Sequence, residues 1–120
     1  MRIMETLDIL LEKKTKAVNL IVKIVKKQNE ALKNFKLEKV VFLNLRKEKI
    51  LGLMKSIDIE MERFLLTKKK YPKNTKDLIK NINSIFNELI NIEKENEILL
   101  NNIIALKKGD YINNYKKYAK

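Results

Sequence analysis

The feature that most constrains this chain is a seven-residue repeat of apolar side chains along stretches that almost lack helix breakers. Three adjacent rows out of seven are mostly apolar in the first stretch, which is the wide stripe of a helix buried in a bundle. The chain of 120 residues has only two glycines and one proline. The repeat therefore predicts helices over about residues 3–33, 37–67 and 75–108. The best row of the first helix reads Met4, Leu11, Val18, Val25, Leu32.

The boundary between the first two helices is indicated by a shift of the apolar rows near residues 33–36. A single straight helix through this point would turn its apolar stripe to water, so we expect a turn with Asn34 in the left-handed conformation. The second connection contains Pro72, which cannot continue a helix, and Asn74 or Thr75 is the expected N-cap of the third helix, with Asp77 in its first turn.

The third helix carries an uninterrupted apolar row that we expect to lie in the core: Leu78, Ile85, Ile92, Leu99 and Leu106. Lys107, Lys108 and Gly109 are typical of a helix C-terminus. We therefore predict that the helix ends near Lys108 and that residues 110–120 form a flexible tail.

Short connections between long helices favour antiparallel neighbours. The expected fold is all-α, an elongated antiparallel three-helix bundle or coiled coil that forms a single domain over residues 1–109. Several large apolar residues fall outside the rows, and contiguous exposed apolar area marks a partner site or a self-association face, so a homodimer is one expectation. These residues are Ile9, Leu20, Leu45, Leu53, Ile59, Ile90, Ile98 and Ile104.

The residue types leave little for catalysis, because the chain has no cysteine and no histidine. This excludes a disulfide framework and a thiolate nucleophile, and Ser56 and Ser84 have no histidine to deprotonate them. Acidic pairs such as Glu93 and Glu97 lie among lysines and indicate a solvated surface. We therefore expect no enzyme activity, no catalytic, cofactor-binding or metal-binding residue, and no small-molecule substrate.

The charge balance raises the question of nucleic acid, since 27 basic and 15 acidic residues give a net charge of +12. Only Arg2, Arg46 and Arg63 can make forked contacts to guanine or phosphate, and the lysines are spread over all three helical segments. A basic nucleic-acid-binding or other coiled-coil interaction module is therefore the alternative interpretation, and nucleic acid is not the partner we favour.

Localisation is constrained by the start of the chain and by the apolar runs. Glu5 and Asp8 stand where a signal peptide would have its apolar segment. No apolar run is longer than four residues, as at residues 40–43, which is far shorter than the roughly 20 residues of a membrane span. We expect a cytoplasmic protein without a membrane span.

Four segments resemble FlgN-type flagellar export chaperones. Asn29-Glu30-Ala31-Leu32, residues 37–43 and residues 47–51 are similar to the run that leads this family's chain around its first hairpin. Residues 88–100, with an asparagine before a Leu-Leu pair, look like the family's last long helix. The resemblance implies a cytosolic chaperone of type III export that holds hook–filament junction subunits and delivers them to the export machinery.

In that family the C-terminal helix and tail contact the client. Carried onto this chain, the resemblance implies apolar contacts through the end of the third helix and anchoring by tail tyrosines. An amphipathic client helix can lie along such a stripe, and tyrosine buries area with few torsions to freeze. The implied partner-binding residues are Asn96, Leu99, Leu100, Ile103, Ile104, Leu106, Tyr111, Ile112, Tyr115 and Tyr118.

Overall fold

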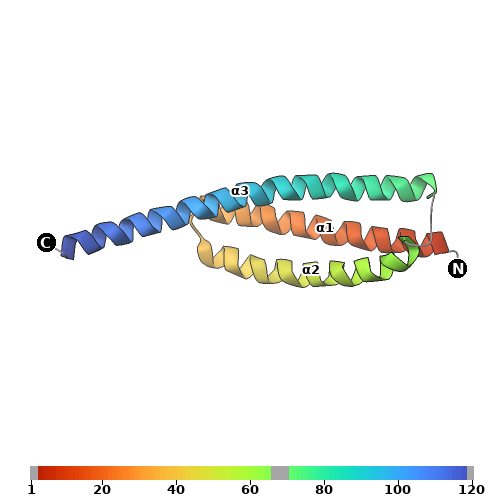
Figure 1. Ribbon diagram of the computed structural model, residues 1–120, viewed down its shortest axis with the longest axis horizontal. Helices are drawn as coiled ribbons and strands as arrows, with labels where there is room; N and C mark the ends of the chain where they lie inside the picture. The colour runs from red at the N-terminus through yellow and green to blue at the C-terminus, as the bar shows by residue number, and fades with distance from the viewer. Residues whose placement is uncertain (1–2, 66–70, 119–120) are drawn as a thin grey trace.

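Over the residues that the structure describes, the chain folds into three long helices that run up, down and up (Figure 1). The computed structural model describes the backbone of residues 3–65 and 71–118 and the side chains of residues 6–64 and 71–109. The helices are α1 (Ile3–Lys33), α2 (Leu37–Leu65) and α3 (Lys73–Tyr118), and the described residues contain no strand. The molecule measures 76 × 22 × 21 Å, so the predicted elongated all-α bundle is confirmed.

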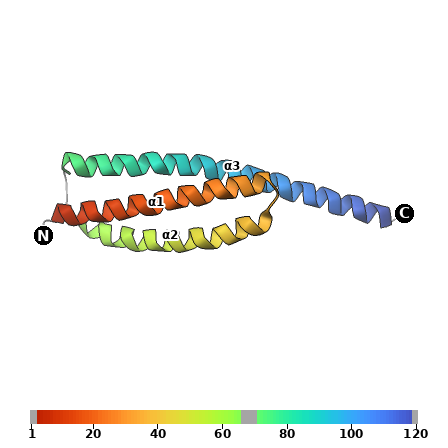
Figure 2. The ribbon, with the colours of Figure 1, turned by 180° about the vertical axis from the view of Figure 1, so that it is seen from behind.

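Helix α1 is the centre of the bundle, with α2 on one side and α3 on the other (Figures 1 and 2). Among the described residues, no Cα atom of α2 comes within 8 Å of one in α3. The core is therefore two interfaces that share α1, which explains why α1 needs the wide apolar stripe seen in its sequence.

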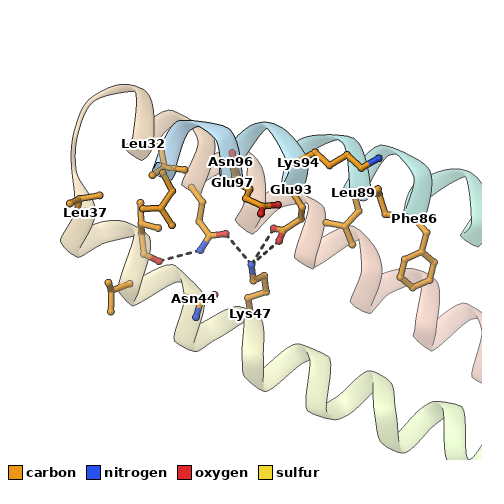
Figure 3. A pocket seen from close by; sticks show the side chains of 15 residues that line it. Leu32, Leu37, Asn44, Lys47, Phe86, Leu89, Glu93, Lys94, Asn96 and Glu97 are labelled. Carbon is orange, nitrogen blue, oxygen red and sulfur yellow. Dashed lines mark hydrogen bonds and ion pairs between the residues drawn. The ribbon is translucent and has the colours of Figure 1, made fainter. Parts of the chain in front are cut away.

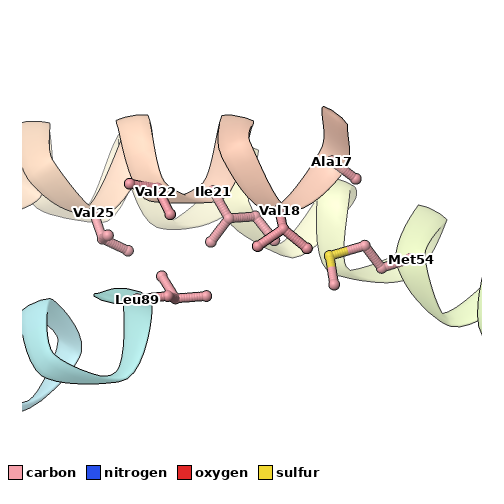
Figure 4. Packing of buried hydrophobic residues seen from close by; sticks show 7 residues of the cluster. All are labelled: Ala17, Val18, Ile21, Val22, Val25, Met54 and Leu89. Atoms are coloured by element: carbon pink, nitrogen blue, oxygen red, sulfur yellow. The ribbon is translucent and has the colours of Figure 1, made fainter. Parts of the chain in front are cut away.

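Among the described residues the core has two clusters, and α1 contributes five of the seven buried residues in one and three of the six in the other. The middle cluster joins Val18 and Ile21 of α1 to Met54 of α2 and Leu89 of α3 (Figure 4). The second cluster lies at the end of the bundle where α1 begins. It contains Leu7, Leu10, Leu11, Ile57, Met61 and Ile82. The predicted α1 row is confirmed at Leu11, Val18, Val25 and Leu32, all of which are buried, while the side chain of Met4 lies outside the described residues.

In α3 the buried row differs from the predicted one. The buried side chains in the described part of α3 are Thr75, Ile82, Leu89, Asn96 and Ile103. In the expected row, Leu78, Ile85, Ile92 and Leu99 are only half-buried and Leu106 is exposed. Because α3 packs against one helix instead of two, only a narrow stripe of it is fully covered. The eight apolar residues outside the rows are all exposed.

The turn between α1 and α2 corrects the prediction for Asn34, because the residue with left-handed backbone is Phe35, at φ 58°. The Lys36 N–H donates to the Ala31 carbonyl at 2.8 Å, and the Phe35 N–H donates to the Leu32 carbonyl at 3.1 Å. These two bonds form a Schellman motif, which places the left-handed residue one position after Asn34. Asn34 instead donates its Nδ2 to the Glu30 carbonyl at 2.9 Å.

The start of α3 also differs from the prediction, because the helix already includes Asn74 and Thr75. The Lys76 N–H donates to the Pro72 carbonyl at 3.1 Å, so neither residue is the N-cap. With the earlier start, Asp77 is not in the first turn, which contains no acidic residue. Asp8 of α1 supplies the negative charge instead, which suits the positive end of the helix dipole. The predicted end of the second helix at residue 67 and the following residues to 70 lie outside the described residues.

The third helix continues to Tyr118, so the predicted end near Lys108 is wrong and residues 110–118 are helical. Gly109 does not have positive φ and therefore does not form a left-handed C-cap. A glycine inside a helix costs about 1 kcal/mol relative to alanine, and no proline follows that would end the helix. The C-terminal part of α3 projects past the α1–α2 turn (Figures 1 and 2).

Candidate functional site: the groove between α2 and α3

An open groove of about 920 Å³ lies between α2 and α3, because the described backbones of both helices pack against α1 and do not approach each other. Leu32 of α1 lies at its floor (Figure 3). The apolar wall residues are Leu37, Val40 and Val41 from α2 and Phe86, Leu89, Ile90 and Leu100 from α3. Concave and mainly apolar surfaces of this kind are where proteins bind ligands or partner segments.

A polar bridge crosses the groove and joins all three helices (Figure 3). The Lys47 Nζ donates to Glu93 Oε1 and Oε2 at 3.1 and 3.3 Å and to Gln28 Oε1 at 3.4 Å. The buried Gln28 in turn donates its Nε2 to the Val40 carbonyl at 3.1 Å. The bridge links α2 and α3 across α1, and the charge of Lys47 is matched by that of Glu93 within the groove.

A second bridge, formed by Lys14 of α1, lies between α2 and α3 further from the α1–α2 turn. The Lys14 Nζ lies 2.6 Å from Asp58 Oδ1 of α2 and 5.6 Å from the ring centroid of Phe86 of α3. Lys14 lies in a mostly apolar row of α1. Its amphipathic side chain fills the space between α2 and α3 with its stem and pairs its charge near the surface. Both bridges place a lysine where a bundle with α2–α3 contact would have an apolar residue.

The structure distributes the predicted partner-binding residues over three environments. Asn96 and Leu100 line the groove, and Leu100 is 37% exposed. Leu99 is half-buried and Ile103 is buried, whereas Ile104 and Leu106 are exposed on the part of α3 near and beyond the turn. Tyr111, Ile112, Tyr115 and Tyr118 belong to the helical backbone at the end of α3, and their side chains lie outside the described residues.

The α2 wall of the groove was missed in the site prediction from sequence. By heptad spacing Leu37 and Val40 lie in mostly apolar rows of α2, whereas the row of Val41 continues with Glu48, Lys55 and Glu62. A usable signal was the run of four apolar residues at 40–43, because consecutive helical positions cannot all face one neighbour. Val40 is half-buried, Val41 is 63% exposed and Leu43 is buried, so the run covers both the interface with α1 and the groove edge.

Compared with known proteins, the chain matches no family model, no curated protein and no solved structure. None of the described helices combines the length and apolar character that crossing a membrane requires.

Proposed function

We propose that this protein is a noncatalytic chaperone or adaptor that holds an amphipathic helix of a client protein in the groove between α2 and α3. The observation that carries the proposal is the groove itself, about 920 Å³ in volume and walled by apolar residues from both helices. Exposed Leu100 and Ile104 extend the apolar surface along α3. A helix laid in such a groove contacts it through residues at i, i+3, i+4 and i+7.

The resemblance to FlgN-type export chaperones suggests the class of client, a hook–filament junction subunit awaiting type III export. The segments that carry the resemblance include both walls of the groove: residues 37–43 provide Leu37, Val40 and Val41, and residues 88–100 provide Leu89, Ile90 and Leu100. The net charge of +12 favours a client segment with an acidic polar face. In this proposal the protein acts in the cytoplasm, before the client reaches the export machinery.

The charges around the groove favour a protein client over nucleic acid. Lys47 is paired with Glu93, and Lys94 alternates with Glu93 and Glu97 along the α3 wall. A surface that binds a phosphate backbone would instead present an uninterrupted row of cations. The nucleic-acid alternative therefore depends on net charge alone.

The proposal is tested by calorimetric titration of the purified chain with the hook–filament junction subunits encoded in the same genome. The informative variant combines Ile90→Asp with Leu100→Asp, two groove residues that are 47% and 37% exposed and whose change should leave folding intact. We expect an affinity loss of more than about tenfold, since losing one well-packed apolar anchor exceeds 1.4 kcal/mol.

The matched control is Leu20→Asp, which places the same charge on α1 at a position that is 49% exposed and outside the groove. It should bind as the parent does. Absence of binding by the parent chain would contradict the client class. Equal binding by the parent and the double variant would contradict the groove as the site.

A further inference from the structure

The outer face of α2, which points away from α1, is exposed along its whole described length. It is a stripe with alternating spacings of three and four residues, the pattern of a coiled-coil seam. Phe42, Leu45 and Ile59 on this stripe are 62%, 57% and 58% exposed. We define the outer face as the stripe Glu38, Phe42, Leu45, Lys49, Gly52, Ser56, Ile59 and Arg63, all of them exposed.

This face is separate from the groove, because none of its residues lines the groove. Helix α2 thus buries one side against α1, while three large apolar side chains on its opposite side, Phe42, Leu45 and Ile59, remain in water. Exposed apolar patches that recur at coiled-coil spacing mark an interaction surface for another helix. The charges that flank the stripe identify which helix fits.

We propose that the outer face of α2 pairs with the outer face of α2 in a second copy of the chain, antiparallel, with the two-fold axis between Ile50 and Leu51. In this register Phe42 faces Ile59 of the second copy and Leu45 faces its Ser56. At the ends, Glu38 faces Arg63. By the two-fold symmetry each pair occurs twice.

The flanking charges are complementary in the same register. Glu48 lies beside Lys55 of the second copy, on one edge of the seam. On the other edge Lys39 lies beside its Glu60. All four residues are exposed, and within the described part of the chain none of them forms an ion pair. Opposite charges at the edges of a coiled-coil seam set the orientation of the helices.

A parallel pairing would bring like charges together. Identical seam positions then meet, so Lys49 would face Lys49 and Arg63 would face Arg63. In the antiparallel register Lys49 faces Gly52 of the second copy instead. A Cβ atom at Gly52 would meet nothing within 4 Å, so its own fold does not require the glycine, which as a helical residue costs about 1 kcal/mol relative to alanine. The missing side chain leaves room for the lysine stem across the seam.

The test is sedimentation equilibrium of the full chain and of charge-swapped variants. The parent is expected to dimerise below about 100 µM. Glu48→Lys and Lys55→Glu should each weaken dimerisation about tenfold or more, because each places like charges together twice. The double swap should restore the parental affinity, since both pairs become opposite again. Glu12→Lys, an exposed position on α1, is the matched control and should dimerise as the parent does.

Disulfide trapping checks the register independently, because the chain contains no cysteine of its own. A mixture of Leu45→Cys and Ser56→Cys chains should form a mixed disulfide under mild oxidation. Leu45→Cys alone should not, since its two copies lie about 16 Å apart along the seam. A parent that stays monomeric at about 100 µM, or a double swap that fails to recover dimerisation, overturns the proposal. Neither result bears on client binding in the groove.

Discussion

Asn96 of α3 accepts a hydrogen bond at its Oδ1 from Asn29 Nδ2 of α1 at 2.9 Å, and its own Nδ2 donates to the Val25 carbonyl at 3.1 Å. Both polar atoms of this buried amide are thus engaged with α1. A buried amide in a mostly apolar helix interface favours one register over its neighbours, because a slip leaves the amide unpaired. This pair explains why the row through Asn96 faces α1.

We expect Asn96→Asp to lower the free energy of unfolding by about 3 kcal/mol, because a buried carboxylate cannot donate to the Val25 carbonyl and brings a charge into the interface. Asn96→Leu should cost less, about 1 kcal/mol, since an apolar residue of similar size removes the bonds to Asn29 and the Val25 carbonyl but brings no charge into the interface. Urea denaturation of both variants measures the difference. If the two variants are equally stable, the amide does not hold the helices in register.

A second prediction concerns Phe35, whose left-handed backbone costs a side chain about 1 kcal/mol. Because Phe35 is 65% exposed, replacing it by glycine removes little packing. We expect Phe35→Gly to raise the free energy of unfolding by about 1 kcal/mol, measured by urea denaturation. Asn34→Gly is the comparison, and it should be destabilising because it removes the side-chain bond to the Glu30 carbonyl. A loss of stability in Phe35→Gly would mean that the phenyl ring stabilises the turn.

The sequence predicts α1 well and α3 less well, for a reason visible in the packing. Helix α1 is covered from two sides, so its apolar repeat and its buried residues coincide, as at Val18 and Val25. Helix α3 is covered from one side only. Its longest apolar row, from Leu78 to Leu106, therefore lies beside the interface, and the row interrupted by Asn96 is buried instead. Apolar periodicity indicates a stripe but not which edge of it faces a single neighbour.

The groove could not be predicted for a similar reason. An apolar repeat on α2 and α3 is compatible with direct contact between these helices, as expected in a closed bundle. The lysines that hold them apart, Lys14 and Lys47, each stand in a row of otherwise mostly apolar residues. Their pairing with Asp58 and Glu93 requires contacts 44 and 46 residues apart in the chain, which helical spacing alone does not reveal.

A third prediction concerns the contact between the start of α3 and α1. Thr75 is fully buried and donates its Oγ1 to Asp8 Oδ1 at 2.7 Å. Thr75→Val keeps the shape of the side chain but leaves the carboxylate oxygen without this donor, so we expect a loss of about 2 kcal/mol in unfolding free energy. Thr75→Ser keeps the hydroxyl and should lose less, as thermal denaturation followed by circular dichroism would show. Equal losses would attribute the effect to packing of the methyl group.

The last prediction concerns the end of α3, where Ile103 is the last buried side chain among the described residues. Removing residues 110–120 deletes helix that projects beyond α1 and α2, so the melting temperature should change by less than about 4 °C, the shift expected for under 1 kcal/mol. The helical signal in circular dichroism should fall only by the contribution of the residues removed.

The same truncation tests client binding. If Tyr111, Tyr115 and Tyr118 anchor a client, the affinity measured by calorimetry should weaken by tenfold or more while the melting temperature stays unchanged. A truncated chain that binds as the parent does would restrict the client site to the groove, and a large fall in melting temperature would show that the projecting helix packs on the bundle.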